Sequence, residues 1–166
     1  MQAIYVDTCY FQGYLWGRRD DKENADFILS KLESTVRRHP TITVRVPFIV
    51  VGELVNNLVR DGLDESKRNE IMVKFFEKLQ KLKADIIPPK PTCYNWTKIL
   101  VTRDPRLVKN APTDCFIALC ALCDPDSAYL LTNDAVVLES SSLKDIEKEM
   151  HENGERNREM KFSQEF

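Results

Sequence analysis

Four acidic residues stand where carboxylates can act together. Asp7 and Asp134 each directly follow a short run typical of a buried strand. Glu53 lies within the first two turns of a predicted helix, and Asp114 lies in the first turn of another. In a parallel sheet, ligands bind outside the carboxyl ends of the strands, and carboxylates that converge there need a cation to offset their repulsion. Because hard oxygen ligands suit Mg²⁺ or Mn²⁺, we expect a site for one of these metals.

Each of these acids also has an ordinary structural explanation. Asp7 and Asp134 are typical turn formers after strands. Asp114 complements the positive end of a helix, and Glu53 is a solvated helix residue. Taken singly, each residue is better explained in this way, and the hypothesis of a shared site depends on all four together.

The elements that must position these acids alternate between strand and helix. Strands are predicted at 2–6, 41–46, 84–87 and 128–132, with a last strand at 159–163. Helices are predicted at 10–16, 23–38, 48–62, 64–83, 92–102, 113–123 and 143–153, with Asn110 and Ser142 as candidate caps of the last two. This alternation, with no internal repeat or flexible linker, predicts a single α/β domain over residues 1–166 with a largely parallel sheet.

The motifs that hold these acids follow one another in a familiar order. They are Asp7-Thr8, Val51-Gly52-Glu53-Leu54, Thr113-Asp114 and Leu131-Thr132-Asn133-Asp134. This pattern resembles the PIN-domain nucleases, including the VapC-like ribonucleases, over nearly the whole chain. The resemblance implies a PIN-like three-layer α/β/α fold with a five-stranded parallel sheet in the order 3-2-1-4-5. It also implies a metal-dependent ribonuclease in which Asp7, Glu53, Asp114 and Asp134 hold one or two Mg²⁺ or Mn²⁺ ions and thereby hydrolyse RNA phosphodiester bonds.

Residues beside the acids are candidates for supporting roles. Thr8, Thr113 and Asn133 are placed to orient a carboxylate or a metal-bound water, although capping or turn formation explains them equally well. The chain departs from the family at Cys9, where Ser or Asn is common. It departs again at residues 135–138, where many relatives carry another acidic or amide residue and an aromatic.

Binding of RNA would need a local basic patch, because the net charge is -2 and the pI is about 5.8. Tyr10, Tyr14 and Trp16 are candidates for base stacking, with a buried aromatic face as the alternative. The loop before Asn110 is expected to present part of the basic patch. The candidate phosphate-binding residues are Arg18, Arg19, Arg103, Arg106 and Lys109.

Composition excludes several classes of protein. With 43% hydrophobic and 30% charged residues and only five Gly, the chain is neither disordered nor collagenous. No apolar run approaches the roughly 18 residues of a membrane span, and no basic leader precedes the first strand. We therefore expect a cytoplasmic protein without a membrane partner.

The five cysteines lack the spacing of a disulfide framework and are interpreted as buried hydrophobes. Cys120 and Cys123 have the spacing of a zinc or redox pair. No second pair completes a zinc site, and the first cysteine of a redox pair normally begins a helix, whereas this pair ends one.

Two other functions remain open at this stage. One is a PIN-fold module with a weak or inactive site that binds RNA or protein in RNA processing. The other is the toxin of a toxin–antitoxin pair, which would have the same chemistry and a small inhibitory protein partner. A homodimer is a further candidate assembly. Metal-dependent cleavage distinguishes the enzyme from the inactive module, and a cognate inhibitor identifies the toxin.

Overall fold

A five-stranded parallel sheet forms the centre of the computed structural model, which describes residues 2–165. Its strand order is β3-β2-β1-β4-β5, so the predicted order is confirmed. The central strand β1 pairs in parallel with β2 on one side and with β4 on the other, with Ile4 opposite both Val44 and Tyr129. The strands are β1 (Gln2–Val6), β2 (Ile42–Pro47), β3 (Asp85–Ile87), β4 (Ser127–Leu131) and β5 (Lys161–Ser163).

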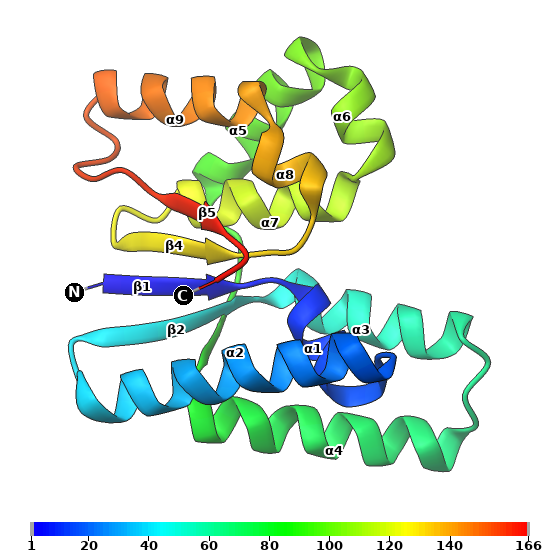
Figure 1. The fold of residues 1–166 in the computed structure, drawn as a ribbon. Helices are drawn as coiled ribbons and strands as arrows, with labels where there is room; N and C mark the ends of the chain where they lie inside the picture. Colours follow the sequence, from blue (N-terminus) through cyan, green and yellow to red (C-terminus); the bar gives the residue numbers. More distant parts are fainter. Residues whose placement is uncertain (1, 166) are drawn as a thin grey trace.

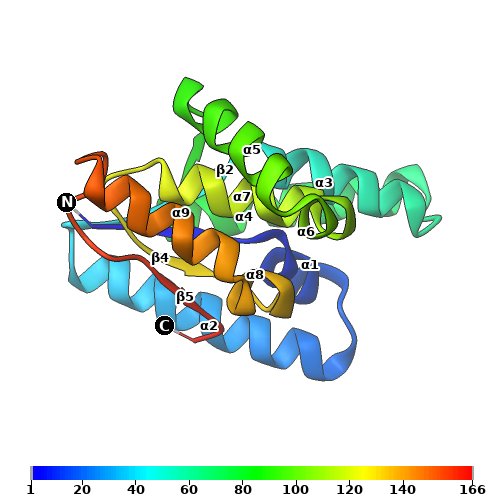
Figure 2. The same cartoon turned by 90° about the horizontal axis from the view of Figure 1, so that it is seen from above.

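Helices cover the sheet on both sides. In Figure 1, α1 to α4 gather on the β2 side of β1, and α5 to α9 gather on the β4 side. Figure 2 shows α2 on one side of the strands and α3 and α5 on the other. The helices are α1 (Thr8–Trp16), α2 (Arg19–Arg38), α3 (Phe48–Arg60), α4 (Glu65–Leu82), α5 (Pro91–Arg103), α6 (Pro105–Asn110), α7 (Pro112–Leu122), α8 (Ala135–Glu139) and α9 (Ser141–Glu152).

The apolar pattern explains which helices are buried most deeply. Helix α7 is apolar on all sides, and its residues from Ile117 to Leu122 are all buried against the sheet and its neighbours. In α4, by contrast, Ile71, Phe75 and Leu79 form one buried stripe, as the sequence predicted. Within the described residues, no helix is both long enough and apolar enough to cross a membrane.

Several local predictions are wrong. The segment before Asn110 is the short helix α6 rather than a loop, because Asp104 caps it and Pro105 begins it. Asn110 therefore ends a helix instead of capping α7. Likewise, Ser140 rather than Ser142 caps α9, since its side chain accepts the Leu143 N–H at 3.2 Å.

Candidate active site

Asp7 and Thr132 become neighbours through the pairing of the two central strands. Val6 lies opposite Leu131 in the parallel register, so the residues that follow them leave the sheet side by side. The Thr132 hydroxyl donates to Asp7 Oδ2 at 2.6 Å, and the Thr8 backbone N–H donates to Asp7 Oδ1 at 2.6 Å. Both oxygens of this buried carboxylate are thus fixed by the ends of β1 and β4.

Glu53 joins this group through Thr8. The Thr8 hydroxyl donates to Glu53 Oε2 at 2.5 Å, which links the start of α1 to the sixth residue of α3. Glu53 is half-buried, whereas Asp7 is 2% exposed. The predicted supporting role of Thr8 therefore has a structural counterpart, because its hydroxyl orients one of the four carboxylates.

Asp134 is linked to Asp7 through Thr132 and caps α8. Its Oδ1 accepts the Val136 and Val137 N–H groups at 2.7 and 3.2 Å, and its own N–H donates to the Thr132 hydroxyl at 3.0 Å. This cap uses one carboxylate oxygen and leaves Oδ2 for another ligand. Asp134 can therefore cap α8 with one carboxylate oxygen and still offer the other to the site.

Asp114, in the first turn of α7, is half-buried and lies among the other acids. Burial and the negative charges of Asp134 and Glu53 raise the pKa of Asp114 to about 6. Burial, followed by the charges of Asp114 and Glu53, likewise raises the pKa of Asp7 to about 7, against the lowering effect of the Thr132 hydrogen bond. Burial is the first cause of both shifts, and repulsion among the carboxylates at the carboxyl end of the sheet adds to it.

No basic side chain offsets this repulsion. In the part of the chain from residue 2 to 165, no Lys, Arg or His forms an ion pair with any of the four acids. Just before β4, at the amino end of that strand, Asp124 pairs with both Arg45 and Lys90. The group of acids without basic partners therefore lies at the carboxyl end of the sheet.

The donor chemistry of this edge fits a hard divalent cation, since it consists of carboxylate oxygens with unused lone pairs. The side chains are more widely spaced than in a formed metal shell: within residues 2–165, no three His, Cys, Asp or Glu residues make a ready ligand group. A cation would have to draw them together. The half-buried Glu53 side chain and the free Oδ2 of Asp134 are suited to such a movement.

Two other polar groups lie beside the acids. The Cys9 thiol donates to Asp7 Oδ2 at 3.6 Å, and burial and the Asp7 charge raise its pKa, so it stays protonated. Asn133 accepts a hydrogen bond from the Tyr10 hydroxyl at 2.9 Å, which holds the segment after β4 against α1. Asn133 thus has a structural partner, whereas Cys9 is an unreactive neighbour of the site.

A groove of about 640 Å³ opens beside the acids. Glu53 and Thr113 lie in its wall, together with the aromatic rings of Phe48 and Phe116 and the side chain of Arg60. Phe48 is 62% exposed. Thr113, the third predicted supporting residue, therefore faces a space large enough for a substrate.

The predicted RNA-contacting residues come from three parts of the fold. Arg103 lies at the end of α5 and is held by Glu149 of α9 through two hydrogen bonds of 2.6 and 2.9 Å. Arg106 and Lys109 are exposed on α6. Arg18 and Arg19 are exposed at the start of α2, where Arg19 pairs with Glu23 at 2.9 Å.

The residues expected to stack on RNA bases are largely engaged in contacts within the protein. Tyr10 is fully buried and cannot stack on a base. Tyr14 lies under the Lys78 ammonium at 4.4 Å, and Trp16 donates to Asp61 at 3.1 Å. The alternative of a buried aromatic face is therefore right for Tyr10.

Sequence reasoning named the Thr-Asn-Asp motif but missed the role of Thr132. Its hydroxyl contacts both Asp7 and the Asp134 N–H, and it is fully buried. The signal is the predicted adjacency of β1 and β4: once that order is assumed, the residues that end the two strands must meet.

This arrangement of strands and helices has a counterpart among solved structures. The fold is similar to that of VapBC2. A crystal structure of VapBC2 from Rickettsia felis, bound to a DNA fragment from their promoter, matches 97% of this chain and 98% of that chain, with a TM-score of 0.56. The sequences are 14% identical, so the likeness is one of fold. No protein-family model matches the sequence, and no curated protein matches it.

Proposed function

We propose that this protein is a divalent-metal-dependent ribonuclease. The observation that carries the proposal is the group of four mutually repelling carboxylates, without a basic partner among residues 2–165, at the carboxyl end of the sheet. The fold shared with VapBC2 supports a PIN-type nuclease. Asp7, Glu53, Asp114 and Asp134 would hold Mg²⁺ or Mn²⁺.

The protein's own residues set the conditions for this chemistry. Asp7 is the fixed member, held by Thr132 and Thr8, while Glu53 and Asp134 complete the anionic edge. When bound, a divalent cation would polarise the RNA phosphate and lower the pKa of a water molecule. No side-chain nucleophile is required, and the one thiol beside Asp7 is kept protonated. The groove beside Glu53 gives an RNA strand access to the acids.

The test is cleavage of single-stranded and structured RNAs in Mn²⁺ and Mg²⁺. Asp7→Asn and Asp114→Asn keep the side-chain shape but lose the charge, so each should reduce cleavage at least about 100-fold. The matched control is Asp26→Asn on the exposed face of α2, which should cleave like the wild type. Equal activity in all variants would assign the cleavage to a contaminant or to another site.

A second outcome of the same assay identifies the inactive module. A wild-type protein that binds RNA with no cleavage in either metal would contradict the enzyme and favour a PIN-fold binding module. Calorimetric titration of Mn²⁺ into the RNA-free protein separates loss of metal binding from loss of RNA binding.

The neighbour also favours one biological setting, that of a toxin with an inhibitory partner, because VapBC2 is a toxin–antitoxin complex. We propose this setting as the second candidate. Expression of the chain alone should then arrest growth, and co-expression of a small protein from the adjacent gene should restore it. Growth arrest that Asp7→Asn does not relieve would contradict a toxic nuclease.

A further inference from the structure

The groove beside the acids follows one side of α3. Four of the residues that line it on this helix are spaced four positions apart, namely Phe48, Gly52, Asn56 and Arg60. Residues with this spacing form one ridge along a helix. From the first to the last of them, the ridge is about 18 Å long, because each helical residue adds about 1.5 Å. Glu53 lies beside the ridge and joins the groove to the acids.

A second wall of the groove comes from α7. Helices α3 and α7 pack against each other, and Thr113 and Phe116 of α7 line the groove. Phe116 lies two residues after Asp114. Its ring contacts the ring of Tyr94 from α5, with the centroids 6.0 Å apart. An aromatic wall is thus held in place next to one of the acids.

Phe48 presents an aromatic ring that the protein itself leaves open. It is the first residue of α3 and is 62% exposed. Gly52, one turn further along, faces the same groove, and a Cβ at this position would meet no packed atom within 4 Å. Glycine is less favourable than alanine inside a helix, and here no packing contact requires it. What Gly52 provides is free space beside the Phe48 ring.

Arg60 places a positive charge at the far end of the groove. Its side chain is 67% exposed and lies 3.8 Å from Asp61, which also accepts the Trp16 indole N–H at 3.1 Å. An exposed ion pair at this distance is weak, so the guanidinium is available to a phosphate. Among the described residues that line the groove, Arg60 is the only cation and Glu53 the only acid. An aromatic ring, the acids and a cation therefore follow one another along α3.

This order matches the chemistry of a single RNA strand. Each nucleotide combines a flat base, which stacks on aromatic rings, with a phosphate, which pairs with a guanidinium. In a duplex the bases are stacked and paired, so their faces are not open to such a site. An apolar peptide would fill the space between the rings but would leave Arg60 without an anionic partner. A single RNA strand is the occupant that uses all three groups.

We propose that the Phe48 ring stacks on an unpaired base of single-stranded RNA, that Phe116 forms the wall beside this base, and that Arg60 binds a phosphate of the same strand. This inference rests on the proposed ribonuclease and identifies its substrate class as single-stranded RNA. The nucleotide that Phe48 holds places a neighbouring phosphate at the acids beside Glu53. Phe48 and Arg60 are thus residues that position the substrate and select unpaired RNA.

The experiment measures binding of an unstructured RNA of about ten nucleotides, with the fluorescent base 2-aminopurine at each position in turn. The wild type is titrated in Ca²⁺ and again in a chelator, so that binding is read without the catalytic metal. Stacking should quench the fluorescence at one position. Phe48→Leu should weaken binding about 10-fold and abolish the quenching, whereas Phe48→Tyr should retain both. The matched control is Phe27→Leu on α2, at a residue that is 66% exposed, and it should bind like the wild type.

Two further variants separate the space in the groove from its charge. Gly52→Gln fills the groove with a neutral side chain that suits a helix better than glycine, so it should weaken binding about 10-fold without lowering the melting temperature. Arg60→Gln should reduce the salt dependence of binding by about one counterion. A blunt RNA duplex of the same length should bind weakly to the wild type and equally weakly to Phe48→Leu.

Equal affinity of the wild type and Phe48→Leu, no quenching at any position, or equally tight binding of the duplex would each overturn the stacking site. A wild type that binds no single-stranded RNA would overturn it as well and leave the groove to a protein partner. Failure of the ribonuclease gives a different result. A protein that never cleaves RNA but binds it through Phe48 would contradict the enzyme and retain the stacking site. A protein that cleaves RNA equally well with Phe48→Leu would retain the enzyme and contradict the stacking site.

Discussion

At the scale of single residues, Thr132 shows how one hydroxyl stabilises a buried charge. Its hydrogen bond lowers the pKa of Asp7, although burial keeps that pKa near 7. Below pH 7 the native carboxyl is mostly protonated and needs the donor less. Above pH 7 the buried carboxylate depends on it. The contribution of Thr132 to stability should therefore grow as the pH rises.

Thr132→Val tests this dependence. We expect a loss of about 2 kcal/mol in unfolding free energy at pH 8 and a smaller loss at pH 5, measured by urea denaturation with a chelator present. The control is Thr43→Val in β2, whose buried hydroxyl has no hydrogen-bond partner in the described structure. That substitution should be neutral or stabilising at both pH values. Equal losses for the two variants would contradict the role given to Thr132.

Asp114 should lower stability when no metal is present. Its native pKa of about 6 exceeds the ordinary value of 3.8, so the unfolded chain releases this proton first as the pH rises. The contribution of the Asp114 carboxyl to the free energy of unfolding is therefore fully present below pH 4 and is lost as the pH rises from about 4 to 6. Because the side chain is partly solvated, we expect Asp114→Asn to gain only about 1 kcal/mol at pH 8.

The gain from Asp114→Asn should vanish near pH 4, where the wild-type carboxyl is protonated in both states. Asp26→Asn, on an exposed turn of α2, provides the charge-matched comparison and should show no such pH dependence. A variant less stable than the wild type at pH 8 in chelator would show that the acids do not repel one another.

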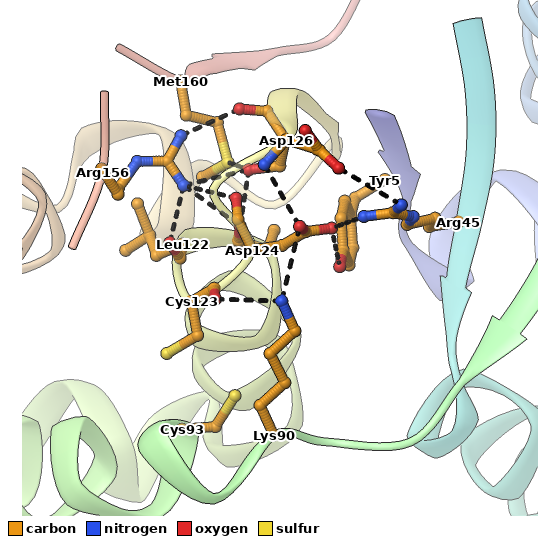
Figure 3. Close-up of polar contacts among 12 residues, drawn as sticks. Tyr5, Arg45, Lys90, Cys93, Leu122, Cys123, Asp124, Asp126, Arg156 and Met160 are labelled. Atoms are coloured by element: carbon orange, nitrogen blue, oxygen red, sulfur yellow. Dashed lines mark hydrogen bonds and ion pairs between the residues drawn. The ribbon is translucent and has the colours of Figure 1, made fainter. Parts of the chain in front are cut away.

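At the scale of elements, a single arginine closes the end of α7. The buried Arg156 guanidinium donates to the carbonyls of Leu122, Asp124 and Ser127 at 2.6 to 3.0 Å (Figure 3). The bond to Leu122 satisfies a carbonyl that the end of α7 leaves without a partner, and the other two bonds hold the turn from α7 into β4. Glu147 of α9 lies 3.8 Å from the same guanidinium, which also connects α9 to this helix end.

Arg156→Leu should cost about 3 kcal/mol in unfolding free energy, since it leaves several buried carbonyls and one carboxylate unpaired. Arg158→Leu changes the same residue type two positions away at an exposed site and should stay within about 0.5 kcal/mol of the wild type. Denaturant midpoints of the two variants give the comparison. A similar small effect in both would mean that water replaces the arginine at the helix end.

The elements also show what sequence patterns can predict. Long periodic segments such as α4 needed only apolar spacing, and the parallel sheet needed only the alternation of strand and helix. The strand order, by contrast, was predicted only from the resemblance to the PIN-domain nucleases. Helices α6 and α8 were missed because six and five residues are too few to show a helical period. The pair of Arg103 and Glu149 joins residues 46 apart and depends on how α5 meets α9. Adjacency across the sheet, which brings Thr132 to Asp7, follows from sequence only after the strand order is assumed.

At the scale of the whole molecule, the two ends of the sheet differ in whether basic side chains neutralise their acidic residues. Before β4, Asp124 accepts a hydrogen bond from Tyr5 at 2.8 Å and pairs with Arg45 and Lys90. At the carboxyl end of the sheet, the four acids have no ion pair among the described residues. One end thus has its acid neutralised by the protein's own basic side chains, whereas the four acids at the other end have no such partner among residues 2–165.

Divalent metal should therefore stabilise the wild type by binding the native state alone. At a concentration about one hundred times the dissociation constant, binding adds about 2.7 kcal/mol, which for a chain of this size raises the melting temperature by roughly 5–10 °C. Asp114→Asn should start higher than the wild type in chelator and gain little from Mn²⁺, so the order of the two proteins should reverse when metal is added. Asp26→Asn should follow the wild type in both conditions. A rise of equal size in Asp114→Asn would place the cation elsewhere, and the absence of any rise in the wild type would leave the four acids as a repulsive edge without a ligand.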